Sequence, residues 1–292
     1  MQTPKQQIST LHIWTETIKA IAKHYKEIIP FVSLFIVLPQ TLFTIGFAKL
    51  SEPVVEKIKS ITQIGLSSSP SLNYKELVTP ASQFFSTYLF FGFLIVLSTL
   101  FAYIFLTINA LSHGDLLSSS THNFKNPYKA ALKILIPKGF LIFVGVGILS
   151  FEQFLFGPFH VFSILALMGI ILLIQSKNGV ISSLWQALTL KFVSNAPGKG
   201  FATFVVILST GILIYLYEAG VSFLTNNLLI LDQWLKISRD YWEYKLPGFP
   251  CTIIFLITQL ITIIAYSALL VFVVFFTSSL YGHVRKKLSE RI

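Results

Sequence analysis

Charge is the first thing that this sequence lacks. Only 12% of its 292 residues are charged, whereas a soluble domain typically carries about 25%. Hydrophobic residues make up 54% of the chain, and the mean hydropathy is +0.73. This balance excludes a soluble domain of this length and predicts a membrane protein that crosses the bilayer several times.

Cysteines and catalytic motifs are scarce too. Cys251 is the only cysteine, which excludes an intrachain disulfide and a cysteine-based metal cluster. The six histidines show no HExxH spacing, and the chain has no P-loop and no GxSxG motif. We interpret His113, Asp115 and His122 as residues of one solvated, Ser-rich loop rather than as metal ligands. We therefore expect no catalytic residue, no cofactor and no metal site, and the chain is not expected to be an enzyme.

The hydrophobic residues are grouped into long runs. A helix of about 20 apolar residues crosses a hydrocarbon core of roughly 30 Å. We predict an all-α, polytopic fold in which residues 1–292 form a single integral membrane domain. Pro39 is expected to kink the first span, and residues 49–82 and 219–250 are expected to be loops. The six predicted spans are 28–48, 84–111, 139–156, 159–174, 200–217 and 251–280.

Amphipathic helices are predicted on the membrane surface before spans one, three and five. In the first of them, apolar residues such as Leu11, Trp14 and Ile18 share one face, while Lys19 and Lys23 lie opposite. The second is expected to end at Pro137 and Gly139, and the third to cover residues 180–192. Basic interfacial helices bind anionic lipid headgroups. The candidate lipid-surface residues are Lys19, Lys23, Lys129, Lys133 and Lys191.

The distribution of basic residues predicts the orientation. The net charge is +10, and 15 of the 22 lysines and arginines fall in the N-terminal segment, residues 112–138, residues 175–199 and the C-terminal tail. By the positive-inside rule these segments are cytoplasmic, so both termini lie on the cytoplasmic side of a cell membrane. We take this membrane to be a bacterial inner membrane. Because the lysines lie beside hydrophobic runs, we expect membrane lipids as partners, with other membrane proteins as an alternative and no nucleic acid.

The unit of surface helix followed by span occurs three times in the predicted topology. This arrangement resembles the six-helix bacterial membrane proteins of the YciC-like kind and the membrane domain attached to some glycerophosphoryl diester phosphodiesterases. The resemblance implies a cytoplasmic-membrane protein and transfers no catalytic residue. The matching residues are Trp14, Ala20 and Lys23, then Tyr128, Ala131 and Lys133, then Trp185, Ala187 and Lys191.

Polar residues on or near the spans are the remaining functional candidates, because each costs free energy in lipid unless it meets a partner or water. They are Asn109, Glu152, His160 and Gln259, and Glu152 and His160 flank a predicted turn at Gly157 and Pro158. Two function classes stay open. A membrane scaffold or lipid-interacting protein predicts a packed bundle with surface helices. A small transporter or permease subunit predicts that the polar candidates face one internal cavity.

Overall fold

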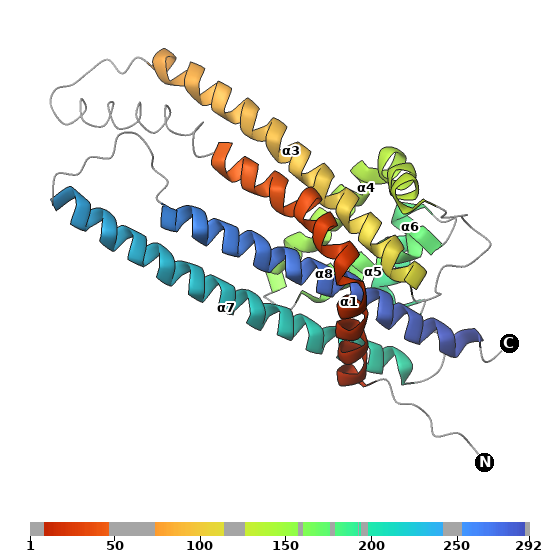
Figure 1. Cartoon of the computed structure of the whole chain (residues 1–292). Helices are drawn as coiled ribbons and strands as arrows, with labels where there is room; N and C mark the ends of the chain where they lie inside the picture. The colour runs from red at the N-terminus through yellow and green to blue at the C-terminus, as the bar shows by residue number, and fades with distance from the viewer. Residues whose placement is uncertain are drawn as a thin grey trace. The chain divides into compact units, whose positions relative to one another are not determined.

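Helices form all the regular structure in the part of the chain that is described. The structure is a computed structural model and describes residues 9–46, 74–113, 126–156, 160–175, 179–191, 193, 198–241 and 253–289. The helices are α1 (Thr10–Val32), α3 (Tyr74–His113), α4 (Pro127–Phe156), α5 (Val161–Gln175), α6 (Val180–Leu188), α7 (Lys199–Tyr241) and α8 (Ile253–Ser289), and η1 (Ser33–Val37) is a π-helical segment (Figure 1). The predicted all-α fold is confirmed for these residues.

Four of the described helical segments are long and apolar enough to cross a membrane. They are Thr10–Gly46, Phe85–Ser112, Lys199–Leu231 and Ile257–Val284. Even the shorter of these segments, at 28 residues, extend about 42 Å at 1.5 Å per residue. This length exceeds a hydrocarbon core of roughly 30 Å. The chain therefore has the four long apolar helices of a multi-pass membrane protein.

The helices at the predicted third and fourth spans differ from the prediction in one respect, which is that no break separates the surface helix from span three. The amphipathic helix does not end at Pro137 and Gly139, because α4 runs without a break from Pro127 to Phe156 with Pro137 inside it. Proline removes one hydrogen bond, a loss that an apolar helix tolerates when neighbouring groups satisfy the freed carbonyl. Helix α5 has only 15 residues, about 22 Å, so it is shorter than a full crossing.

Several helices continue beyond the membrane spans predicted from hydropathy. The expected loop at 219–250 is wrong as far as Tyr241, because α7 continues to that residue. The expected loop at 49–82 is wrong from Tyr74, where α3 begins. The first surface helix is likewise continuous with the first span. Hydropathy indicates where a helix leaves lipid, whereas the helix itself ends only where its backbone hydrogen bonding stops.

Pro39 is accompanied by a π-helical segment and a hydrogen bond from a neighbouring helix, and the kink predicted at Pro39 stays a prediction. Proline has no N–H, so the carbonyl four residues earlier, that of Phe35, loses its helical donor. The hydroxyl of Ser98 on α3 donates a hydrogen bond to this carbonyl. The chain just before Pro39 is π-helical, from Ser33 to Val37. A neighbouring serine thus satisfies a backbone group that would otherwise be costly in lipid.

The chain divides into two units. Unit 1 comprises Met1–Val32, Leu100–Gly220 and Tyr266–Ile292, and unit 2 comprises Ser33–Thr99 and Val221–Ala265. Several helices contribute residues to both units, and the prediction of one integral membrane domain stays a prediction.

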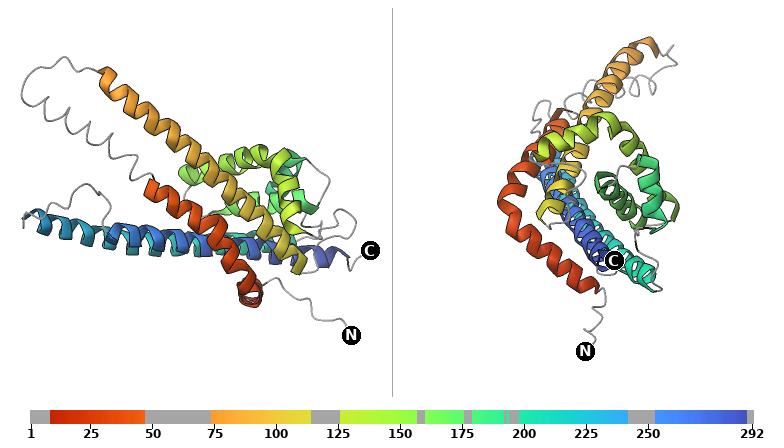
Figure 2. Two further views of the ribbon diagram at one scale, coloured as in Figure 1. Left: turned by 45° about the horizontal axis from the view of Figure 1, so that its top comes forward. Right: turned by 90° about the vertical axis from the view of Figure 1, so that its right-hand side faces the viewer.

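Helix α5 is the core of unit 1. Eleven of its 15 residues are buried, and it packs against α6 and α4 (Figure 2). Gly169 makes this contact close, because a Cβ atom there would lie 2.7 Å from Cδ2 and 3.2 Å from Cα of Leu184 on α6. Small residues at such contacts let helices approach closely inside membranes. The packing of α5 positions the residue just before it, His160.

Candidate functional site

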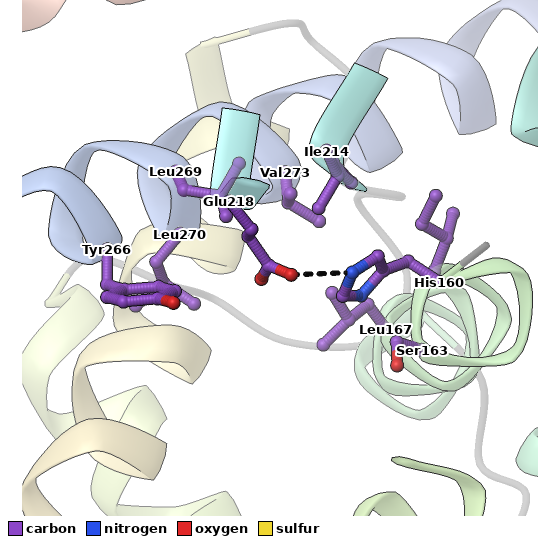
Figure 3. A pocket seen from close by; sticks show the side chains of 10 residues that line it. His160, Ser163, Leu167, Ile214, Glu218, Tyr266, Leu269, Leu270 and Val273 are labelled. Carbon is purple, nitrogen blue, oxygen red and sulfur yellow. Dashed lines mark ion pairs between the residues drawn. The ribbon is translucent and has the colours of Figure 1, made fainter. Parts of the chain in front are cut away.

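A cavity in unit 1 contains an ion pair between a histidine and a glutamate. Its volume is about 210 Å³, and it lies between the start of α5, α7 and α8 (Figure 3). The wall is mostly aliphatic, with a few polar side chains directed into it, which is typical of small-molecule and ion sites. The lining residues are His160, Ser163, Ile164, Leu167, Ile214, Glu218, Tyr266, Leu269, Leu270 and Val273.

His160 and Glu218 form an ion pair in this cavity. The distance from His160 Nε2 to Glu218 Oε2 is 2.8 Å, and the two side chains are 10% and 28% exposed (Figure 3). Glu218 lies within the long apolar segment of α7. An ionisable pair on membrane-spanning helices is costly unless its members satisfy each other, and such groups line ion and proton pathways.

The backbone holds His160 at a helix start. Its carbonyl accepts the hydrogen bond from the N–H of Ile164, 3.0 Å away, in the first turn of α5. Its φ is 45°, in the left-handed region, a conformation that costs a non-glycine residue roughly 1 to 3 kcal/mol. The positive end of the α5 dipole also favours the negative charge of a neighbouring carboxylate. The site is therefore built from a strained backbone position and a carboxylate from another helix.

The cavity brings several polar groups together. An imidazole and a carboxylate in hydrogen-bond contact can share or transfer a proton. Ser163 on α5 and the exposed Tyr266 on α8 add hydroxyl groups to the wall. The described wall therefore combines an imidazole, a carboxylate and two hydroxyl groups.

The polar candidates from the sequence have different fates. His160 lies in the cavity, but its described partner is Glu218, which lies between the predicted span 200–217 and the predicted loop 219–250. Glu152 is in helix α4, and its side chain is outside the described residues, so neither a contact with His160 nor simple hydration near the membrane surface is tested for it. Asn109 on α3 and Gln259 on α8 are half-buried and do not line the described cavity. A hydropathy pattern has no signal for the His160 and Glu218 pair.

All five candidate lysines for lipid binding are exposed. Their exposure agrees with a role at a surface, and the role itself stays a prediction. They are Lys19 and Lys23 on α1, Lys129 and Lys133 on α4, and Lys191 after α6.

Helix α1 has a face that is buried against the protein and, beside it, an apolar face that is exposed. Ile13, Thr17 and Ile28 are buried, so this face packs on the protein. Leu11, Ile18 and Tyr25 recur every seven residues and are exposed. The indole Nε1 of Trp14 donates a hydrogen bond to Thr210 Oγ1 on α7, 3.0 Å away. The predicted apolar stripe is therefore largely exposed, and α1 is attached to the protein by the neighbouring face.

Helices α4 and α6 repeat the arrangement of α1. Leu132 and Ile136 on α4, and Ile181 and Trp185 on α6, are exposed and spaced four residues apart. Ala131 and Ala187 are fully buried, so the alanines in these two repeats face the protein. Exposed apolar side chains thus accompany exposed lysines on α1 and α4, and on α6 they accompany Lys191, which follows that helix.

Comparison with known proteins identifies no relative. No protein-family model matches the chain, and no curated protein or solved structure matches it.

Proposed function

We propose that this chain is a multi-pass cell-membrane protein that interacts with anionic lipids through α1, α4 and α6, which have lysines within them or shortly after them. One observation carries the proposal. The start of α1, the start of α4 and α6 with the turn after it each have exposed apolar side chains next to exposed lysines. Apolar side chains enter the acyl boundary and lysines meet phosphate headgroups, which is the binding mode of interfacial helices.

The faces of α1 support this binding mode. Its contacts with the protein use Ile13 and Trp14, so the helix does not need Leu11 or Ile18 for packing. Those exposed side chains remain available for lipid. Each lysine near a cytoplasmic leaflet contributes about 1 kcal/mol of attraction to anionic headgroups, and five lysines together give strong selectivity.

The topology in this proposal has six membrane segments with both termini cytoplasmic, and α4 and the short α5 are the third and fourth of these segments. The charge distribution of the sequence supports it, and so does the resemblance to YciC-like proteins. The proposed activity is lipid binding or scaffolding without catalysis, and it requires no cofactor.

Lipid analysis of the purified protein tests the proposal. The test variant replaces Lys19, Lys23, Lys129, Lys133 and Lys191 with glutamate. The matched control replaces Lys57, Lys59 and Lys245, which lie in the predicted outer segments, with glutamate. We expect the test variant to lose most of the phosphatidylglycerol and cardiolipin that copurifies with the wild type, and the control to retain it. Equal anionic lipid in the test variant and the wild type would contradict the proposal.

A second function, that of a small transporter or permease subunit, is favoured by the cavity around His160 and Glu218. Proteoliposomes carrying a pH-sensitive dye test it, with proton entry driven by a potassium diffusion potential. We expect Glu218→Gln to reduce proton entry, and Glu27→Gln, which changes an exposed carboxylate on α1, to leave it unchanged. Wild-type flux no greater than that of empty liposomes would remove proton transport as a function.

A further inference from the structure

A second cluster of ionisable residues lies in unit 1, away from the cavity residues. His12 and Glu16 come from α1 and His283 from α8. His12 Nε2 lies 3.2 Å from Glu16 Oε1, and His283 Nδ1 lies 3.5 Å from Glu16 Oε2. The two imidazole rings meet edge to face with their centroids 5.3 Å apart. The three groups converge on one point from two helices.

Buried residues lie beside the cluster on both helices. His12 and Glu16 are four residues apart and share one side of α1. Between them, Ile13 is fully buried and Trp14 is hydrogen-bonded to Thr210. On α8, Tyr281 and Val284 beside His283 are buried. The positions of the three side chains therefore follow from the core of unit 1.

We propose that His12, Glu16 and His283 bind a divalent transition-metal ion of the Zn²⁺ class. Two imidazoles and one carboxylate are ligands that Zn²⁺ and related ions prefer. The candidate ligand atoms all lie within 4.8 Å of one another. Tetrahedral ligands at about 2.0 Å from Zn²⁺ are about 3.3 Å apart, so the site forms with only small side-chain rotations.

The exposure of the cluster suits a hydrated ion. The side chains of His12, Glu16 and His283 are 55%, 43% and 22% exposed, so water can reach an ion and complete its coordination. A bound metal would link α1 to α8, and thus a helix near the N-terminus to one near the C-terminus. This proposal does not depend on lipid binding, because it uses none of the candidate lysines.

Metal titration of the full-length protein tests the site. The protein is purified in detergent after removal of its affinity tag, treated with EDTA, and titrated with Zn²⁺ by calorimetry and with Co²⁺ by visible absorbance. We expect one saturable site, with the stronger Co²⁺ absorbance typical of four- or five-coordinate ions. Saturation below about 100 μM supports the proposal, since a three-residue site binds far more tightly than a single exposed imidazole.

Single substitutions identify the ligands. We expect His12→Ala, Glu16→Ala and His283→Ala each to weaken Zn²⁺ binding more than tenfold. The matched controls are His24→Ala, which lies 12 residues after His12 on α1, about 18 Å along the helix, and His160→Ala in the cavity. Both controls should bind as the wild type does.

The wild-type titration keeps the test decisive if a variant does not fold. Absence of saturable binding by the wild type below about 1 mM, far above the affinities of zinc sites, would overturn the proposal. Unchanged binding by all three ligand variants would also overturn it. In either case the cluster is a metal-free network of ion pairs.

Discussion

Two contacts between histidine and glutamate in unit 1 differ in their surroundings. His160 and Glu218 meet in a cavity, with side chains 10% and 28% exposed. His12 and Glu16 meet on α1, with side chains 55% and 43% exposed. Water screens and solvates the exposed pair, whereas the charges of the less exposed cavity pair are screened less. We therefore propose different roles for the same two residue types, a proton or solute site in the cavity and a hydrated metal site at the exposed cluster.

Removing each glutamate is the strongest way to test this difference. We expect Glu218→Ala to lower the free energy of unfolding by about 2 to 3 kcal/mol, because it leaves His160 without its charged partner. In the presence of EDTA, Glu16→Ala should cost less than about 1 kcal/mol, as exposed ion pairs do. Unfolding in mixed detergent and SDS micelles measures both values, and equal losses would show that burial does not distinguish the pairs.

Zinc should act on one of the two sites only. At one hundred times its dissociation constant, a ligand that binds only the folded state stabilises it by about 2.7 kcal/mol. We expect this increment in the wild type and in His160→Ala, and we expect it to disappear in His12→Ala. Thermal unfolding with and without ZnCl₂ measures it. A zinc effect that needs His160 would instead place the metal in the cavity.

Crowding α5 should disturb the cavity and spare the exposed cluster. Gly169→Ala places a methyl group 3.2 Å from the Cα atom of Leu184, and overpacking of this kind costs about 1 to 3 kcal/mol. Gly220→Ala is the matched control, since nothing lies within 4 Å of its added methyl group. SDS unfolding measures the loss, and Co²⁺ affinity should be the same in both variants. A normal stability for Gly169→Ala would mean that α6 moves away freely.

The smallest loss of stability is expected from breaking a partly buried hydrogen bond between two uncharged groups. Ser98→Ala removes the hydroxyl that donates to the Phe35 carbonyl, and we expect a loss of about 1 kcal/mol, typical of interhelical hydrogen bonds in membranes. Thr44→Val is the control, because Thr44 bonds only within its own helix, to the Gln40 carbonyl 2.9 Å away. SDS unfolding compares them, and equal stabilities would indicate that another group satisfies the Phe35 carbonyl.

The sequence by itself determined the class of the protein and the place of its long helices. Predicted spans 28–48, 84–111, 200–217 and 251–280 each overlap one of the four long apolar segments. Transfer of a segment into lipid depends on the sum of its own residues, so a window of about 20 residues contains the information. The exposure of the five lysines was predictable for the same local reason.

Only the tertiary structure decided which polar groups meet. Glu218 joins His160, and His283 joins His12 and Glu16, across helices that are far apart in the chain. It also decided that α7 continues to Tyr241 and that Pro39 is accompanied by a π-helical segment and a hydrogen bond from Ser98. Such outcomes depend on which helices pack together and at what depth. No periodicity within one helix contains that information, because the partner lies on another helix.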